Sequence, residues 1–329
     1  MPRLRRRRAR AIRAAMDLVE LAPAVYACVQ EDRGLGTSNS GLLDRAGGLV
    51  VDTLWDLAHT RDLIATYARV WSGPARRVVN THNNGDHCWG NQLFPGAEII
   101  GHRMCAENFA KENPRMLQAL RDATASSEPA IADIAAQLAD WDFSGIELTP
   151  PTTLVDERME FELDGITVHL IWVGPAHTAG DLIVHLPRER IVFTGDVLFR
   201  LCTPIGWEGT SAQWVRALDT IVALRPAVIV PGHGPLCGIE GPKEMRAYLE
   251  YVRREAERGF ADGLQALEAA KRIDPGPYAR WTAPERMLSI VQRAYRELRG
   301  EPMDAPIDVA GLFRGMYELR QAQQARLSA

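Results

Sequence analysis

Short runs of β-branched and other apolar residues alternate with turn signals and helical stretches along the chain from Leu21 to about Pro235. The apolar runs predict strands at 24–30, 47–53, 75–81, 97–102, 166–174, 181–187, 190–196 and 227–233. Helical spacing of apolar residues fits between several of these runs, for instance at 60–71 and 212–224. The mixture predicts an α/β fold for residues 17–240.

Two parts of the chain depart from this alternation. Residues 103–142 favour helices, interrupted by the polar stretch 123–129, and we expect this insertion to form a wall of a substrate pocket. After Pro235 the strands stop, and residues 242–299 favour helices that DPGP at 274–277 and Pro284 separate. We therefore predict a helical C-terminal module over 241–329 that either packs over the site or pairs subunits.

The composition is that of a globular protein, with 46% hydrophobic and 24% charged residues among 329. No run of about 18 apolar residues occurs, so the sequence predicts no membrane span. The five cysteines are far apart and form no CxxC pair. This spacing argues against a disulfide framework and favours a reducing cytoplasm.

Charge is distributed unevenly along the chain. The first 16 residues contain seven arginines and no acidic residue, so the formal charge of −4 leaves about −11 on the remainder. No apolar segment follows these arginines, as a secretory signal would require. We predict a disordered basic tail over 1–16, or an extension before a true start at Met16. A nucleic-acid partner is not expected, because an acidic body repels phosphates.

Candidate metal ligands follow the predicted strands. His82, Asp86 and His87 come after the run 75–81, and one further group follows each of three later runs. These groups are His177 in GPAHTAGD, Asp196 in FTGD and His233 in PGHGP. Zinc and similar ions prefer imidazole and carboxylate ligands, and residues at the ends of several strands converge on one edge of a sheet. The order predicts a metal site.

In this order of motifs the sequence resembles the metallo-β-lactamase-fold superfamily over about residues 24–235. The motifs are Asp52 in GGLVVDT, His82-x-Asn84-x-Asp86-His87, His177, Asp196 and His233. The resemblance implies a four-layer αββα sandwich with two metal positions at one edge. One position would take His82, residue 84 and His177. The other would take Asp86, His87 and His233, with Asp196 bridging.

Asn84 stands where the family has a second histidine. A neutral amide oxygen is a poorer donor for zinc than imidazole, although harder ions accept it. At the Asp86 position we expect one tightly bound divalent ion, with zinc as the first expectation. At the other position we expect an ion that is weakly bound, exchanged for another metal, or absent. A site of nitrogen and oxygen ligands also suits iron or manganese. Asp52 is expected to orient the loop by hydrogen bonds, with a strand-end turn as the alternative.

Four further residues are candidates for substrate binding, namely Trp89, His102, Arg200 and Trp207. Trp89 is next to the metal loop and Trp207 follows the Asp196 strand by a loop, so both are candidates for a pocket wall. His102 ends the run 97–102 and faces either the insertion or a packing surface. Arg200 would either anchor an acidic substrate or lie in solvent.

The leading hypothesis is a metal-dependent hydrolase of a small ester, thioester, lactone or similar molecule. In it, a metal-bound hydroxide attacks, and Asp86 or Asp196 carries the proton. A second hypothesis keeps the metal and runs an oxygenation, lyase or cyclisation step on a specialised metabolite. A third is a non-catalytic regulatory protein that binds metal. The resemblance also leads us to expect a homodimer through the C-terminal helices.

Overall fold

The computed structural model describes residues 16–32, 34–302 and 305–327. The predicted basic tail therefore lies outside the described residues, except for Met16, which begins the first strand instead. Among the described residues, no helix is long and apolar enough to cross a membrane.

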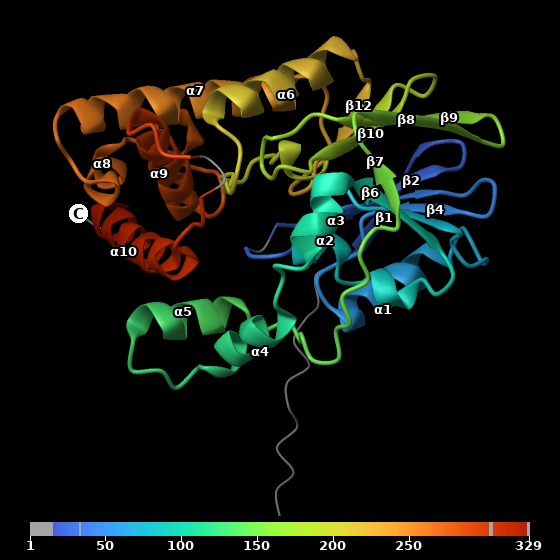
Figure 1. The fold of residues 1–329 in the computed structure, drawn as a ribbon, viewed down its shortest axis with the longest axis horizontal. Helices are drawn as coiled ribbons and strands as arrows, with labels where there is room; N and C mark the ends of the chain where they lie inside the picture. The colour runs from blue at the N-terminus through green and yellow to red at the C-terminus, as the bar shows by residue number, and fades with distance from the viewer. Residues whose placement is uncertain (1–15, 33, 303–304, 328–329) are drawn as a thin grey trace, which may run out of the picture.

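Two β-sheets form the centre of the molecule (Figure 1). The first sheet contains, in spatial order, β1 (Met16–Ala22), β2 (Val25–Gln30), β3 (Ser40–Leu43), β4 (Leu49–Val51), β5 (Arg77–Val79), β6 (Glu98–His102) and β7 (Thr153–Val155). The second contains β12 (Val228–Val230), β11 (Ile191–Phe193), β10 (Leu182–Leu186), β9 (Ile166–Trp172) and β8 (Arg158–Leu163). Strands β4 to β7 are parallel to one another, and so are β11 and β12. Their carboxyl ends define the edges where side chains converge.

Apolar side chains from the facing sides of the two sheets form one core. Its members include Leu43, Val79, Leu170, Val184 and Phe193. Because these strands are buried on both faces, they carry near-continuous apolar runs.

Helices cover the outer faces of both sheets. Leu63 and Tyr67 of α1 (Leu57–Tyr67) pack on the first sheet. The second sheet is covered by α6 (Ser211–Ala223) and α7 (Glu240–Ala261), through a cluster that includes Trp214, Leu218 and Met245. The arrangement is therefore an αββα sandwich, as expected from the sequence.

The insertion and the C-terminal helices meet on the side of the sheets where the strands of the motifs end (Figure 1). The insertion forms α3 (Arg103–Phe109), α4 (Pro114–Asp122) and α5 (Pro129–Gln137), while α8 (Ala266–Arg272), α9 (Met287–Leu298) and α10 (Val309–Leu327) follow α7. Arg320 of α10 bonds to Asp133 of α5 at 2.8 Å, and Arg314 bonds to Glu128 at 2.5 Å. These bonds join two segments that lie far apart in the sequence.

All eight predicted strands correspond to observed strands, but the sequence analysis missed four others. These are β1, β3, β7 and β8. It also placed no helix at α10, although it assigned that region to a helical module. The missed strands are short or carry charged residues on an exposed face, as in RMEFEL of β8, so their apolar signal is weak.

Candidate metal centre

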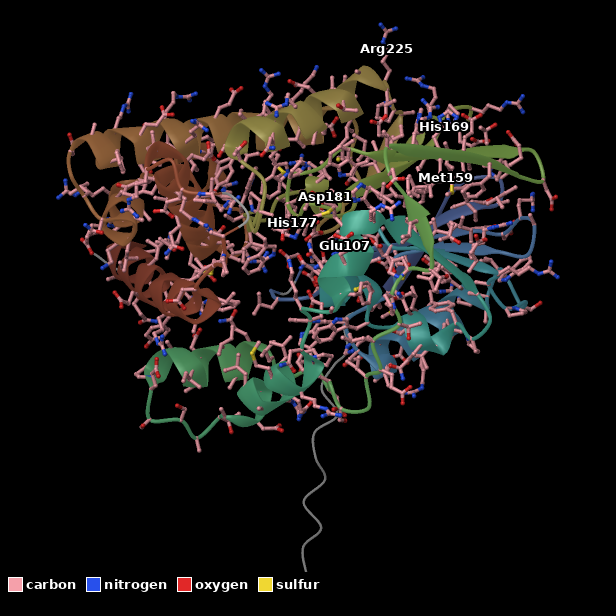
Figure 2. The ribbon with its side chains drawn as sticks, viewed as in Figure 1. Glu107, Met159, His169, His177, Asp181 and Arg225 are labelled. Carbon is pink, nitrogen blue, oxygen red and sulfur yellow. The ribbon has the colours of Figure 1, made fainter. Side chains whose placement is uncertain are left out.

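The predicted ligands come from five separate segments and meet at one place. His82 follows β5, and Asp86 and His87 lie in the short helix α2 (Gly85–Cys88). His177 lies in the loop between β9 and β10, Asp196 in the turn after β11, and His233 after β12. All are buried except Asp86, whose side chain is 15% exposed. Figure 2 shows His177 between the sheets and the C-terminal helices.

A glycine makes room for the Asp196 carboxylate. A Cβ atom on Gly232 would lie 2.0 Å from Oδ1 of Asp196, so only glycine fits at this position. The glycine in PGHGP therefore has a steric role beside the histidine that follows it.

Each of the four histidines uses Nδ1 for a structural contact. The contacts are His82 to Oγ1 of Thr81 at 3.0 Å, His87 to Oδ2 of Asp52 at 2.9 Å, His177 to the carbonyl oxygen of Ile205 at 2.7 Å, and His233 to the carbonyl oxygen of Thr37 at 3.0 Å. A neutral ring that donates from Nδ1 presents the lone pair of Nε2 to its other side. All four Nε2 atoms face the same centre, which is the orientation that metal ligands need.

Asp52 forms hydrogen bonds to Thr81 and His87 beside the centre. Its Oδ1 accepts the backbone N–H of Thr81 at 2.7 Å, and its Oδ2 accepts the Thr81 hydroxyl at 2.7 Å as well as Nδ1–H of His87. The backbone of Asp52 has a φ of 59°, a left-handed conformation that aspartate tolerates better than most residues. Asp52 thus contacts the ligand loop by hydrogen bonds.

The set Asp86, His87, His233 and Asp196 has regular spacing. Nε2 of His87 lies 3.1 Å from Asp196, 3.4 Å from Nε2 of His233 and 3.6 Å from Asp86. Nε2 of His233 lies 3.3 Å from both carboxylates. Four donors at zinc bond lengths in a tetrahedron are about 3.3 Å apart. The spacing therefore fits one ion between Asp86, His87 and His233, with one of the two Asp196 oxygens, Oδ1 near His87 or Oδ2 near His233, as a fourth donor.

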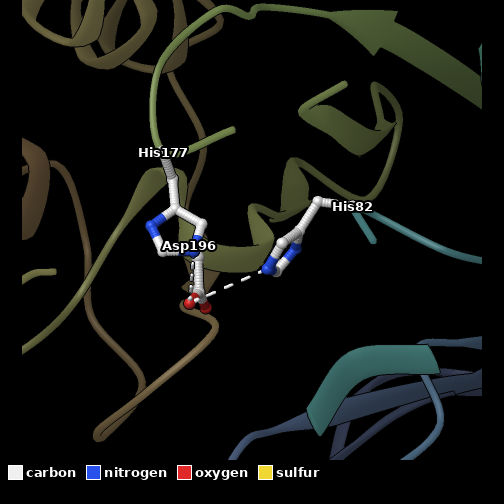
Figure 3. A group of neighbouring side chains, drawn as sticks. All are labelled: His82, His177 and Asp196. Carbon is white, nitrogen blue, oxygen red and sulfur yellow. Dashed lines mark ion pairs between the residues drawn. The ribbon is translucent and has the colours of Figure 1, made fainter. Parts of the chain in front are cut away.

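The set His82, His177 and Asp196 is less regular (Figure 3). Oδ2 of Asp196 lies 3.3 Å from Nε2 of His177 and 3.9 Å from Nε2 of His82. Oδ1 of Asn84 lies 2.7 Å from Nε2 of His177. The structure thus brings Asn84 to this position, but the contacts spread over a wider range than in the other set.

The charges of the two sets differ. Burial lowers the pKa values of His82 and His177 below the ordinary value, so both rings are neutral at pH 7. Burial also opposes protonation of His233, but Asp196 and Asp86 outweigh it and raise the pKa of His233 to about 10. The same carboxylates, with Asp52, raise the pKa of His87 well above its ordinary value against the effect of burial. In the metal-free protein, two imidazolium rings therefore neutralise the carboxylates.

Nε2 of His82 is buried without a hydrogen-bond partner among the described residues, and Oδ1 of Asp196 has only the ionic contact with Nε2 of His87 at 3.1 Å. A buried polar atom without a partner is costly, and a bound cation would satisfy both atoms. Together with the inward Nε2 atoms, these two atoms show that the residues fit a divalent metal. Cys88 does not take part, because its Sγ donates to the carbonyl oxygens of Asn83 and Asn84.

A cavity of about 330 Å³ opens above the centre. Asn84, Asp86, His177, Asp196 and His233 line its floor. Its walls are mainly apolar and include Met116 and Leu117 of α4, Ile134 of α5, and Val309 and Phe313 of α10. The insertion and the C-terminal module therefore both form walls of the cavity, which is in the size range of small-molecule sites.

Two of the four predicted substrate-binding residues line this cavity. Trp89 and Trp207 are part of its wall. His102 and Arg200 are not, and the structure gives no support to their predicted role. His102 caps α3 by accepting the N–H of Met104 and stacks on Trp172 at 5.1 Å. Arg200 forms an ion pair with Glu244, so a local partner already satisfies its charge.

The sequence analysis missed several residues that the structure places at the site. Thr81, which precedes His82, links Asp52 to the first histidine. Asp181 closes the His177 loop by accepting the N–H and hydroxyl of Thr178, and its place four residues after His177 was an available signal (Figure 2). Glu112 and Arg286 line the cavity, and no local motif marks either of them.

Glu112 is a titratable group at the cavity wall. Nδ2 of Asn83 donates to its Oε1 at 3.2 Å. Burial, with a smaller contribution from the Asp86 charge, raises the pKa of Glu112 to about 7. Its protonation state therefore changes near neutral pH.

Comparisons with known proteins agree with the geometry. A family model described as the metallo-beta-lactamase superfamily matches residues 33–233. The linear primary-alkylsulfatase of Pseudomonas sp. (strain ATCC 19151) is 22% identical over 86% of this chain and 60% of its own length. The 2,4-dinitroanisole O-demethylase subunit alpha of Nocardioides sp. (strain JS1661) is 24% identical over 69% of this chain and 60% of its own length.

The solved structure of a stereoselective inverting sec-alkylsulfatase from Pseudomonas sp. shares the fold with a TM-score of 0.64 and 18% identity. It covers 89% of this chain, and the match covers 52% of that chain. The present chain thus spans only about 60% of the length of the two curated relatives it matches.

Proposed function

Because the chain belongs to the metallo-beta-lactamase superfamily, we propose that it is a metal-dependent hydrolase of an ester-type small molecule. Asp86, His87, His233 and Asp196 would hold one tight divalent cation, with zinc as the expected metal and iron or manganese as alternatives. His82, Asn84 and His177 would hold a second cation weakly. The spacing of the first set, 3.1 to 3.6 Å between donors, is the observation that carries the proposal.

A bound divalent cation supplies Lewis-acid polarisation and lowers the pKa of water toward neutrality. The chain contributes orientation and proton transfer. Asp86 is the more exposed carboxylate of the set, so it is placed to accept a proton from the attacking water and return it to the leaving group. Asp196 is buried, and its carboxylate lies within 3.3 Å of Nε2 of His87, His177 and His233, so it would orient the water.

The cavity indicates which substrates fit. Its volume of about 330 Å³ and its apolar walls favour an ester with an aliphatic chain or an aromatic ring. Carboxylic esters, thioesters, lactones and sulfate esters all meet this description. The alkylsulfatase names of two matched proteins support the inclusion of sulfate esters. The O-demethylase relative supports the inclusion of an aryl methyl ether in any substrate test.

The test is hydrolysis of a substrate panel by purified, zinc-loaded protein. The panel contains a nitrophenyl ester, an acyl thioester, a lactone, an alkyl sulfate and 2,4-dinitroanisole. We expect turnover of at least one of the first four, loss of that turnover on chelation, and recovery when zinc is returned. His233→Ala is expected to be inactive, whereas His185→Ala, which removes a buried histidine of β10, keeps activity. Turnover that survives chelation and His233→Ala would contradict the proposal.

The cytoplasmic location and the homodimer through the C-terminal helices remain predictions of the sequence. Gel filtration with light scattering tests the second of these directly.

A further inference from the structure

Arg286, a cation that the hydrolytic step does not use, is one of the residues that line the cavity. Arg286 ends the 3-10 turn Pro284–Arg286 just before α9, in the C-terminal module. Its exposed fraction is 4%, yet it lines the same cavity as His177, Asp196 and His233. A residue more than 50 positions beyond the last predicted ligand therefore reaches the site.

The guanidinium of Arg286 has no hydrogen bond or ion pair within the part of the chain that the structure describes. The hydrogen bonds of this residue are made by its backbone, whose carbonyl accepts from Ser289 and whose N–H donates to Ala283. Neighbouring charges are satisfied elsewhere, because Glu285 pairs with Arg320 at 2.7 Å and Arg320 also pairs with Asp133. Burying a cation without a partner is costly, so its retention beside a cavity indicates a ligand.

The surroundings define the ligand that such a group would take. A guanidinium presents a planar fork of donors that matches carboxylate and sulfate oxygens. Besides Arg286 and the polar residues Lys111, Glu112 and Asn113, the walls are apolar, with Leu117, Ile134 and Phe313 among them. Lys111 is exposed, so Arg286 is the buried cation of the cavity. A molecule that satisfies both features has an oxyanion attached to an apolar chain or ring.

We propose that Arg286 binds the oxyanion of an amphiphilic substrate, a carboxylate or a sulfate, while the apolar part lies against α4, α5 and α10. The inference rests on the proposed hydrolytic function and narrows its substrates to anionic amphiphiles. The C-terminal module, which contains none of the predicted metal ligands, would therefore contribute to substrate specificity.

Binding of three probes by calorimetry tests this inference. The probes are octanoate and octyl sulfate, both below their micelle concentrations, and the neutral analogue 1-octanol. Arg286→Met keeps a side chain of similar length and removes the charge. Arg286→Lys keeps the charge but lacks the planar set of guanidinium donors. The control is Arg246→Met, which removes an exposed arginine of α7 that pairs with Asp219 and Glu250.

We expect Arg286→Met to lower the affinity for the more tightly bound of the two anions by roughly 10-fold or more, which is the effect of losing a charge-assisted hydrogen bond. Arg286→Lys should fall between this variant and the wild type, and octanol binding should not change. Whichever anion binds more tightly identifies the oxyanion as carboxylate or sulfate. Equal binding of the anions by the wild type and Arg286→Met, or an equal loss for octanol, would overturn the inference.

Two further measurements distinguish anion binding by Arg286 from a structural role of this residue and from the proposed hydrolysis. Because Arg286 has no side-chain partner among the described residues, Arg286→Met should leave the Tm of the unliganded protein unchanged or higher. A clear fall in Tm would assign Arg286 to structure and overturn the inference. The calorimetry is repeated in His233→Ala without metal. Arg286-dependent anion binding there would uphold the inference even if the proposed hydrolysis failed.

Discussion

Oδ1 of Asn84 lies 2.7 Å from Nε2 of His177, inside the centre where a cation would bind. His177 is neutral and donates its one ring proton from Nδ1 to Ile205, so Nε2 is an acceptor. Two acceptors repel at this distance. The pair is satisfied either when the amide nitrogen turns toward His177 or when both atoms bind one cation. In the first case the amide competes with the metal for His177.

This competition predicts the effect of Asn84→His. A second imidazole beside His82 and His177 should strengthen binding of a second equivalent of zinc by roughly 10-fold or more, because imidazole is the better zinc ligand. Calorimetric titration of metal-free protein measures it. Asn83→His is the control, since Asn83 points to Glu112 and away from the centre. If the affinity for the second zinc ion were unchanged in Asn84→His, residue 84 would not be the cause of weak binding at this position.

Asp52→Asn removes a charge while keeping a residue that tolerates the left-handed backbone. The variant should lose roughly 10- to 100-fold in zinc affinity, because His87 and Thr81 lose the carboxylate that orients them. Competition with a chromogenic chelator measures the loss. Asp164→Asn, which also has a positive φ but lies in an exposed turn, should bind zinc like the wild type. A normal affinity in Asp52→Asn would mean that Asp52 serves only as a turn residue.

Metal binding should release protons. The pKa of His233 is about 10 and that of His87 is well above its ordinary value in the metal-free protein, so both rings are protonated at pH 7. A cation must displace these protons, and zinc affinity should therefore fall as the pH is lowered from 8 to 6. Calorimetry in two buffers with different ionisation enthalpies counts the protons. Identical heats in the two buffers would contradict this description of the centre.

Glu112→Gln tests the buried carboxyl of the cavity wall. Its pKa is about 7 in the folded protein and has an ordinary value of 4.5, so the native state binds the proton more tightly than the unfolded chain. The wild type should therefore lose free energy of unfolding relative to Glu112→Gln as the pH rises from about 4.5 to about 7, by at most about 3 kcal/mol.

Urea unfolding of the metal-free proteins at pH 5 and pH 8 measures this difference. Asp181, whose burial also raises its pKa to about 7, is present in both proteins and cancels. Glu107→Gln, which removes an exposed carboxylate of α3 (Figure 2), is the control. A difference between Glu112→Gln and the wild type that does not change with pH would refute the assignment.

Much of the fold and of the centre was predictable because both depend on local patterns. The carboxyl ends of β5, β11 and β12 carry His82, Asp196 and His233, and apolar runs mark these strands clearly. Strand β3, SGLL, begins at the last residue of the polar stretch TSNS, which resembles a turn. Its burial comes from pairing with β2 and β4, which its own four residues do not reveal.

The cavity was less predictable because tertiary contacts build it. Trp89 and Trp207 were found because each is near a ligand motif. Arg286 belongs to a helical region without any motif, and its place in the cavity depends on how α9 and α10 pack against the insertion. The contacts of His102 and Arg200 were not predictable for the converse reason, since Trp172 and Glu244, their partners, are distant in sequence.

We expect one tight metal ion, held by Asp86, His87, His233 and Asp196. Elemental analysis of protein purified without added metal, beside His233→Ala and His82→Ala, decides whether this ion is present. We predict about one equivalent of zinc, iron or manganese in the wild type and in His82→Ala, and far less than one in His233→Ala. A wild type without metal after zinc or iron is supplied, or loss of metal in His82→Ala but not in His233→Ala, would contradict a tight ion at these four residues.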